Sequence, residues 1–91
     1  MEFEWDKAKA AINLRKHRVS FDEAATVFAD TLSSTFADPD HSLEEDRYLT
    51  IGMSDQGRVL IVSHTNRGDR LRIISARIAT RRERSAYEEE G

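Results

Sequence analysis

Hydrophobic and polar positions along the chain follow two different periods. In the segment from 47 to 53, Leu49, Ile51 and Met53 occupy alternate positions, which is typical of a half-buried strand. Two later segments are rich in β-branched residues and are set apart by turn-forming residues that include glycine. The strands predicted on this basis cover residues 47 to 53, 59 to 65 and 71 to 78, and they form an antiparallel meander.

Helices are predicted where capping residues precede a helical spacing of apolar positions. Asp6 is a suitable N-cap, and two capping boxes follow, one from Ser20 to Glu23 and one from Thr80 to Glu83. The expected helices run from Lys7 to about His17, from about residue 21 to near Asp30, and from about Arg81 onward.

The first helix is expected to be amphipathic. Its apolar residues form a narrow stripe that would face the sheet: Ala8, Ala11, Ile12 and Leu14. Its basic residues would then lie on the opposite, solvated face: Lys7, Lys9, Arg15 and Lys16.

Short strands are also expected at residues 3 to 5 and 33 to 37, the first of them at a sheet edge. The complete order is then β-α-α-β-β-β-β-α in a single domain over residues 1 to 91. This order predicts an α+β fold, in which a small antiparallel sheet carries two N-terminal helices on one face and a C-terminal helix at its end. A chain of 91 residues is long enough for one hydrophobic core.

The composition indicates a globular chain with segregated charge. Hydrophobic residues make up 38% and charged residues 34%, which excludes disordered and membrane-spanning classes. No apolar run is long enough for a membrane span or a signal peptide, so a cytoplasmic location is expected. The absence of cysteine excludes disulfides and thiolate metal sites. Residues 1 to 57 hold six basic and twelve acidic side chains, whereas residues 58 to 84 hold eight arginines and two acids.

The stretch from Arg70 to Arg84 concentrates this positive charge, with six arginines and one acid. Its apolar half fixes Arg72 and Arg77 on a strand. Its second half places Arg81 and Arg82 in the first turn of a capped helix. Free backbone amides, the helix dipole and guanidinium groups all favour an anion. The stretch is therefore predicted to bind phosphate.

Three segments give the chain a family resemblance: FEWDKAKAAINLRKHRVSFDEAATVFAD, EEDRYLTIG and RIISARIATRRERSAYE. Together they resemble the BrnT family of bacterial type II toxin-antitoxin systems over nearly the whole chain. The residues that match the family pattern are Trp5, Asp6, Asn13, Lys16, His17, Phe21, Asp30, Arg72, Ile74, Ser75, Ala76, Arg77, Arg81, Glu83 and Tyr87.

The resemblance implies a RelE-like fold and a toxin that blocks translation by cutting RNA. It further implies neutralisation by a BrnA antitoxin with a ribbon-helix-helix domain, so that DNA is contacted only through the antitoxin. One position departs from the family pattern: after Lys16 and His17 the family usually has glycine, and this chain has Arg18. The helix end must then use a different cap or place arginine in an uncommon backbone conformation.

Metal-independent RNA cleavage needs an acceptor for the 2′-hydroxyl proton, cations for the pentacovalent phosphate and a donor for the leaving 5′-oxygen. Arginine suits the second role because its planar fork stays charged and holds two phosphate oxygens. The candidate catalytic residues are Arg77, Lys16, His17, His64 and Arg81, and the candidate RNA-binding residues are Arg72, Arg82 and Tyr87. No metal or cofactor is expected.

Each candidate also has a purely structural interpretation. The arginines could pair with Glu83 or with the acidic C-terminal residues. His17 could bond the last carbonyls of its helix, and His64 could pack in the core. Tyr87 could anchor the last helix, or it could donate a proton or stack on a base.

Strand geometry limits the use of two arginines in one site. Arg72 and Arg77 are five positions apart and would point to opposite faces of a regular strand. Both can serve one site only if the strand bulges or ends near Ser75. The acidic segment from 38 to 46, which includes His41, has the spacing of neither an EF-hand nor a zinc site and is interpreted as a solvated loop.

Two other functions stay open at this point. The first is a catalytically silent module whose arginines grip an acidic antitoxin segment and which contributes only to operator binding. The second is an RNA-binding domain that does not cleave, which would show a salt-dependent affinity for RNA and leave the strands intact. Growth arrest that persists after replacement of Arg77 by alanine, with the antitoxin still released, would support the first of these.

Overall fold

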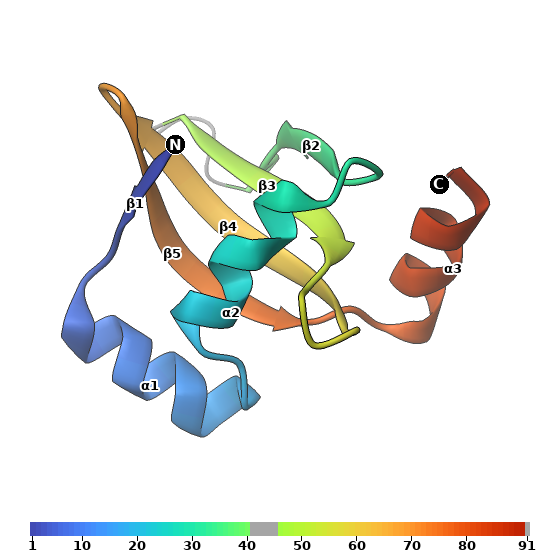
Figure 1. Cartoon of the computed structure of the whole chain (residues 1–91), viewed down its shortest axis with the longest axis horizontal. Coiled ribbons are helices and arrows are strands. Elements are labelled where there is room, and N and C mark those ends of the chain that lie inside the picture. The colour runs from blue at the N-terminus through green and yellow to red at the C-terminus, as the bar shows by residue number, and fades with distance from the viewer. Residues whose placement is uncertain (41–45, 91) are drawn as a thin grey trace.

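The computed structural model describes residues 1 to 40 and 46 to 90 and shows the predicted order of helices and strands (Figure 1). The elements are β1 (Glu2–Glu4), α1 (Lys7–His17), α2 (Phe21–Thr26), the 3-10 helix η1 (Val27–Ala29), β2 (Ser34–Ala37), β3 (Arg47–Met53), β4 (Val59–Arg67), β5 (Arg70–Ile78) and α3 (Arg81–Glu90). β4 and β5 are longer than predicted because the turn between them is reduced to two residues. Gly68 in that turn has a φ of 64°, a conformation that glycine adopts without strain.

The strands form one sheet in the order β1-β5-β4-β3-β2. The predicted antiparallel meander is confirmed for β2 to β5. β1, however, pairs in parallel with β5, so the five-stranded sheet is mixed and not purely antiparallel. The cause is the helix that follows β1: α1 runs alongside β5 toward the C-terminal end of that strand, and β1 must enter it from the same direction.

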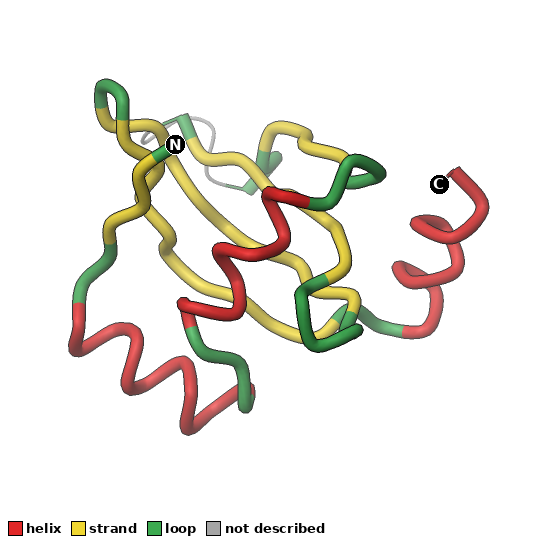
Figure 2. The backbone as a smooth tube through the Cα atoms, in the orientation of Figure 1, coloured by secondary structure: helices red, strands yellow, loops and turns green. Residues whose placement is uncertain are grey.

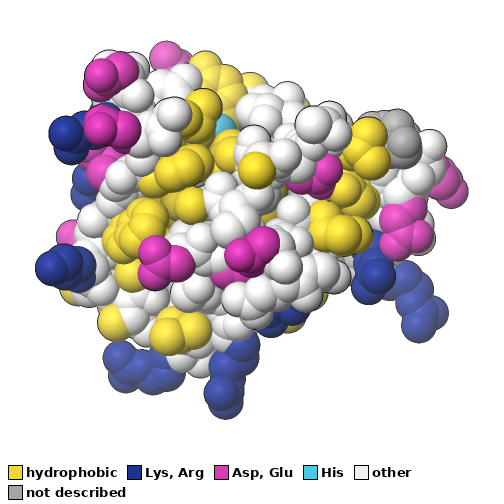
Figure 3. All heavy atoms as spheres, in the orientation of Figure 1, with side chains coloured by type: hydrophobic (Ala, Val, Ile, Leu, Met, Phe, Trp, Pro, Cys, Tyr) yellow, Lys and Arg dark blue, Asp and Glu magenta, His cyan; other side chains and the backbone are white. Residues whose placement is uncertain are grey.

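Figures 1 and 2 show α2 lying across one face of the sheet, where the core is packed. The buried residues of this core are Val19, Phe21, Ala24, Val27, Leu60, Val62, Leu71, Ile73 and Ala76. Gly52 on β3 lets η1 approach closely, because a Cβ atom there would lie 2.8 Å from a methyl carbon of Val27. In the space-filling view of this face, basic side chains project mostly from the margins (Figure 3).

The predicted apolar stripe of α1 is wrong. Ile12 and Leu14 are 58% and 50% exposed, whereas Asn13 is the buried residue of this helix and Ala10 packs against the core. The reason is the position of α1 beside β5, where the open backbone groups of Ala76 are bonded by the side chain of Asn13. In the described ranges, no helix has the length and apolarity that crossing a membrane requires.

The predicted helix caps are formed, with one change. Asp6 accepts hydrogen bonds from the first amides of α1, at 2.8 and 3.1 Å. Ser20 caps α2, but Glu23 does not complete the capping box and instead binds the Arg58 guanidinium and a serine hydroxyl. Arg18 ends α1 with φ 60° and ψ 31°, the uncommon left-handed conformation that was one of the two possibilities in the absence of glycine.

Candidate active site

A β-bulge at Ile74 sets the direction of the side chains on β5. Ser63 of β4 pairs with Ser75, and the next residue, His64, pairs with Ile73. Ile74 is therefore an extra residue without a partner on β4, and the alternation of side chains along β5 is reset at this point.

The reset places Arg72, Ser75 and Arg77 on one face of the sheet. They lie opposite three β4 residues that are two positions apart and so share a face: Thr65, Ser63 and Ile61. The other face of β4 carries Leu60 and Val62, which pack in the core under α2. The two arginines thus point away from α2 on the same side, as a shared site requires.

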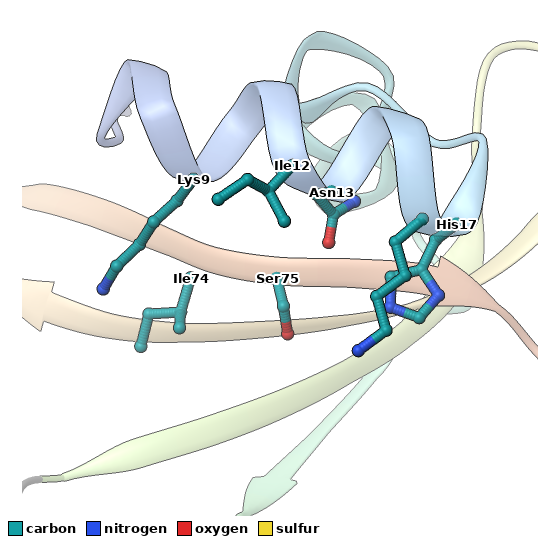
Figure 4. Close-up of a pocket in the computed structure, with 7 residues that line it drawn as sticks. Lys9, Ile12, Asn13, His17, Ile74 and Ser75 are labelled. Atoms are coloured by element: carbon teal, nitrogen blue, oxygen red, sulfur yellow. The ribbon is translucent and has the colours of Figure 1, made fainter.

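A groove runs between α1 and β5 beside this face, and we call it the α1–β5 groove (Figure 4). It encloses a cavity of about 210 Å³ and is lined by Lys9, Ile12, Asn13, Lys16, His17, Ile74 and Ser75. Asn13, Lys16 and His17 share one side of α1 because helical residues three and four positions apart are neighbours. The structure therefore brings Lys16 and His17 together over the bulged part of β5.

Asn13 forms the fixed floor of the groove. Its side chain is 5% exposed and donates to the carbonyls of Val19 and Ala76, both at 2.9 Å. Its oxygen accepts a hydrogen bond of 3.1 Å from the Ala76 amide. The amide side chain thus forms the hydrogen bonds that the backbone groups of β5 would otherwise lack beyond the point where β1 ends. Since Ala76 lies between Ser75 and Arg77, this contact fixes α1 relative to both.

Arg77 is held by a carboxylate from α3. Its two terminal nitrogens donate to the two oxygens of Glu83 at 2.8 and 2.9 Å. Glu83 also accepts from the Thr80 amide, and Thr80 accepts from the Glu83 amide, so the predicted capping box is formed. The hydrogen bonds from Arg77 lower the pKa of Glu83 to about 2, and the pKa of Arg77 is raised in turn. The guanidinium is therefore charged and oriented before any ligand binds.

The basic groups on α1 have no such partners. Lys9, Lys16 and His17, which we call the α1 basic cluster, make no ion pair with any residue in the described ranges. On β5, by contrast, Arg72 donates to Glu4 at 2.8 Å. A groove with unpaired basic groups at both ends is suited to an anion.

Comparison with known proteins shows which family the chain belongs to. The family model described as the ribonuclease toxin BrnT of type II toxin-antitoxin systems matches residues 5–83. The chain belongs to the BrnT family. It is therefore a ribonuclease toxin, an endoribonuclease that has an antitoxin partner and RNA as its substrate.

A solved structure supports the fold. The crystal structure of the Brucella abortus ribonuclease toxin BrnT at 1.1 Å resolution superposes with a TM-score of 0.71 and 24% sequence identity, covering 89% of this chain and 99% of that one. At this identity the likeness shows a shared α+β fold. No curated protein sequence matches the chain.

Among the other candidates for the BrnT site, His64 lies apart from the groove. It is 4% exposed on the core side of the sheet, with the ring of Phe28 5.0 Å and that of Tyr48 6.0 Å away. Its Nε2 is 2.7 Å from the Thr50 hydroxyl. Burial lowers the pKa of His64 to about 4, so the imidazole is neutral at pH 7 and out of reach of RNA.

Tyr87 anchors α3 to the body of the toxin. Its hydroxyl donates to the carboxylate of Asp30, which also accepts from the backbone amides of Leu32 and Met53. The hydrogen bond to Asp30 raises the pKa of Tyr87 to about 12. Its proton is thus engaged inside the structure. Arg81 and Arg82, on the first turn of α3, are exposed.

Sequence reasoning missed three polar residues of the groove: Lys9, Asn13 and Ser75. Asn13 belongs to the matched BrnT pattern, but no role followed from that. Its signal is the spacing from Lys9 to Asn13 to His17, four residues each, which marks one polar side of α1. His41, interpreted as a loop residue, lies outside the described residues. In the described part of the chain, no group of three or more metal-binding side chains is found.

Proposed function

We propose that this BrnT toxin cleaves RNA without a metal ion, where the α1–β5 groove meets Arg77. The carrying observation is the contact of Asn13 with Ala76, because it sets Lys16 and His17 of α1 beside the strand face that bears Arg77. In this reaction the ribose 2′-oxygen attacks the adjacent phosphorus. A 2′,3′-cyclic phosphate forms, and the 5′-oxygen leaves with a proton.

Three side chains carry the reaction in this proposal. His17 accepts the proton of the 2′-hydroxyl, since imidazole exchanges protons readily near neutral pH. Arg77 binds the phosphate as negative charge grows on its oxygens. Lys16 stabilises the leaving 5′-oxygen and supplies its proton. Arg81 and Arg82 extend the positive surface along α3 for the rest of the RNA strand.

The bond to Glu83 leaves Arg77 able to act. A guanidinium carries five N–H donors in one plane, and Glu83 takes one from each terminal nitrogen. The Nε edge of the plane still offers two parallel donors for two phosphate oxygens. Glu83 therefore orients Arg77 without occupying all of it, which is the arrangement expected of a preorganised donor.

The donor set of the groove supports a reaction without metal. Its polar lining consists of amines, an imidazole, an amide and a hydroxyl, with no carboxylate. Divalent cations such as Mg²⁺ prefer carboxylate and other oxygen ligands. Positive side chains supply the charge stabilisation that a metal ion would otherwise supply.

In the cell we propose that cleavage of RNA by this toxin blocks translation in the cytoplasm. The partner we propose is a BrnA-like antitoxin with a ribbon-helix-helix domain, which links the toxin to DNA. Support for a protein partner comes from the outer side of α1, where the apolar side chain of Leu14 is 50% exposed.

The first test compares Arg77→Ala with the wild type in bacteria, each expressed from a tightly repressed promoter. New RNA 5′ ends and growth arrest are expected from the wild type alone. With purified toxin, the substitution is expected to lower the cleavage rate by about 10² to 10³ fold, as for loss of one preorganised donor. Arg84→Ala is the matched control, because Arg84 also pairs with a carboxylate, Glu88 at 2.9 Å, but lies on the exposed side of α3.

Equal protein levels and equal circular dichroism spectra are needed for this comparison. New RNA ends that persist in the Arg77→Ala strain would remove Arg77 from the mechanism. Growth arrest without new RNA ends in either strain would instead favour a binding module that acts on its partner or on RNA without cutting it.

A further inference from the structure

The α1–β5 groove is longer than one phosphate group requires. Figure 4 shows Lys9 at one end and His17 at the other, with Asn13 and Ser75 between them. Lys9 and Lys16 are seven residues apart on α1, which is about 10 Å along the helix axis. The basic groups of the groove are thus spread along it and do not converge on a single point.

Lys9 is not engaged by a neighbouring acid. Glu4 binds Arg72, and Asp6 accepts the backbone amides at the start of α1. Lys9 contributes to the lowered pKa of Asp6, after those amide bonds, yet the two side chains form no ion pair. In the described part of the chain, its ammonium is available to a ligand at the end of the groove away from His17.

The middle of the groove suits a sugar between two phosphates. Ile12 and Ile74 form apolar walls, and the Ser75 hydroxyl makes no hydrogen bond to any described residue. The floor is rigid because the amide of Asn13, which is 5% exposed, forms three hydrogen bonds with the backbone. A nucleotide backbone can lie along such a surface with its phosphates at the two basic ends.

We propose that Lys9 binds a second phosphate of the RNA, next to the phosphate that is cleaved. This rests on the proposed function, in which the cleaved phosphate lies at the end of the groove with His17 and Arg77. Lys9 takes no part in bond breaking. It raises the affinity for RNA that carries a phosphate beside the cleavage site, and so selects chains over a minimal dinucleotide.

The test uses Lys9→Gln and the matched control Lys7→Gln. Lys7 is the first residue of α1, is exposed and does not line the groove. The substrates are a dinucleoside monophosphate, which has only the cleaved phosphate, and the same compound with one added phosphate at its 5′ or its 3′ end. Lys9→Gln is expected to raise KM about fivefold or more for one extended substrate, with kcat unchanged. The minimal substrate and the Lys7→Gln toxin are expected to be unaffected.

A second readout is independent of catalysis. Binding of a single-stranded RNA with a 2′-O-methyl group at the cleavage site is measured against salt concentration. Loss of one phosphate contact is expected to reduce the slope of log affinity against log salt by about 0.7 in Lys9→Gln only. If the wild type binds this RNA but does not cleave the unmodified RNA of the same sequence, the proposed ribonuclease mechanism fails while the phosphate contact of Lys9 is still tested.

Three results would overturn the inference. The first is an equal effect of both lysine substitutions. The second is a loss for the minimal substrate as large as that for the extended ones, which would make Lys9 a ligand of the cleaved phosphate. The third is unchanged RNA binding together with weaker binding of the antitoxin, which would assign Lys9 to the protein partner.

Discussion

Two sets of basic side chains lie on the two elements that form the α1–β5 groove, one set on α1 and one on β5, and they differ in their partners. On β5, Arg72 and Arg77 are each bound by a carboxylate. The α1 basic cluster has no ion pair within the described residues. The two sets lie on neighbouring elements that the Asn13–Ala76 contact joins, and they differ in whether a carboxylate binds them.

This difference in pairing indicates that the two sets have different roles: one orients a donor toward the phosphate, and the other attracts the RNA. A paired guanidinium is held at a fixed angle, but its carboxylate partner cancels much of its field at a distance. An unpaired lysine is mobile but attracts phosphate at full charge. We therefore expect β5 to supply the fixed donor of the reaction and α1 to supply most of the affinity for RNA.

The largest effect is expected from removing the proposed proton-transfer group, His17, from the α1 basic cluster. His17→Ala is expected to lower kcat by about 10² to 10⁴ fold, which is the usual contribution of a general acid or base. Purified toxin and a labelled RNA provide the measurement. Arg15→Ala, on the outer side of α1, should retain wild-type activity. A His17→Ala toxin that cleaves as fast as the Arg15→Ala toxin would show that α1 only binds RNA.

The next prediction concerns the contact that holds the two sets together. Asn13→Ala leaves the carbonyls of Val19 and Ala76 and the Ala76 amide without their partner. Each unsatisfied buried group costs about 1 to 3 kcal/mol, so we expect the free energy of unfolding to fall by about 3 kcal/mol once water has replaced part of the loss. Urea unfolding measures this, and Asn66→Ala, at an exposed position, should change it by less than about 0.5 kcal/mol.

The substitution Asn13→Asp tests whether Asn13 positions α1 for activity or only stabilises the fold. It keeps the acceptor for the Ala76 amide but loses both donors. If Asn13 fixes α1 relative to Arg77, this variant should lose cleavage rate at temperatures where circular dichroism still shows a folded chain. Full activity in a destabilised but folded Asn13→Asp toxin would limit the residue to stability.

The helices and most strands were predictable because their signals are local. Asp6 and Thr80 mark helix starts within three residues of sequence, and the alternation in β3 lies within seven residues. The parallel pairing of β1 was not predictable in this way, since it joins Glu2 to Arg70 across the whole chain. For Arg18 the absence of glycine left two possibilities, a different cap or an uncommon backbone conformation, and the structure shows the second.

The site was predictable only in part, for the same reason. The sequence indicates that Arg72 and Arg77 conflict in a regular strand, but only the pairing with β4 reveals the bulge at Ile74 that removes the conflict. Asn13 was overlooked because the nearby apolar residues suggested a different buried side for α1. At a sheet edge, open backbone groups favour a side chain that can bond them, and an amide meets that need better than leucine does.

The smallest expected effect contrasts His17 with the buried His64. Burial lowers the pKa of His64 from 6.5 to about 4, so the unfolded chain binds a proton in this range that the folded toxin does not. Stability should therefore fall as pH falls from about 6.5 toward 4, by about 2 kcal/mol between pH 7 and pH 5. Glu83 affects stability in a lower pH range, because its lowered pKa removes stability only as pH falls from about 4.5 toward 2.

Urea unfolding at several pH values measures the slope of the free energy of unfolding against pH. In His64→Gln, whose amide can still bond Thr50, the slope above pH 5 should vanish, whereas His17→Ala should keep it. A slope that survives in His64→Gln would mean that another group takes up the proton. The pH dependence of stability would then no longer support the placement of His64 on the buried side of the sheet, away from His17.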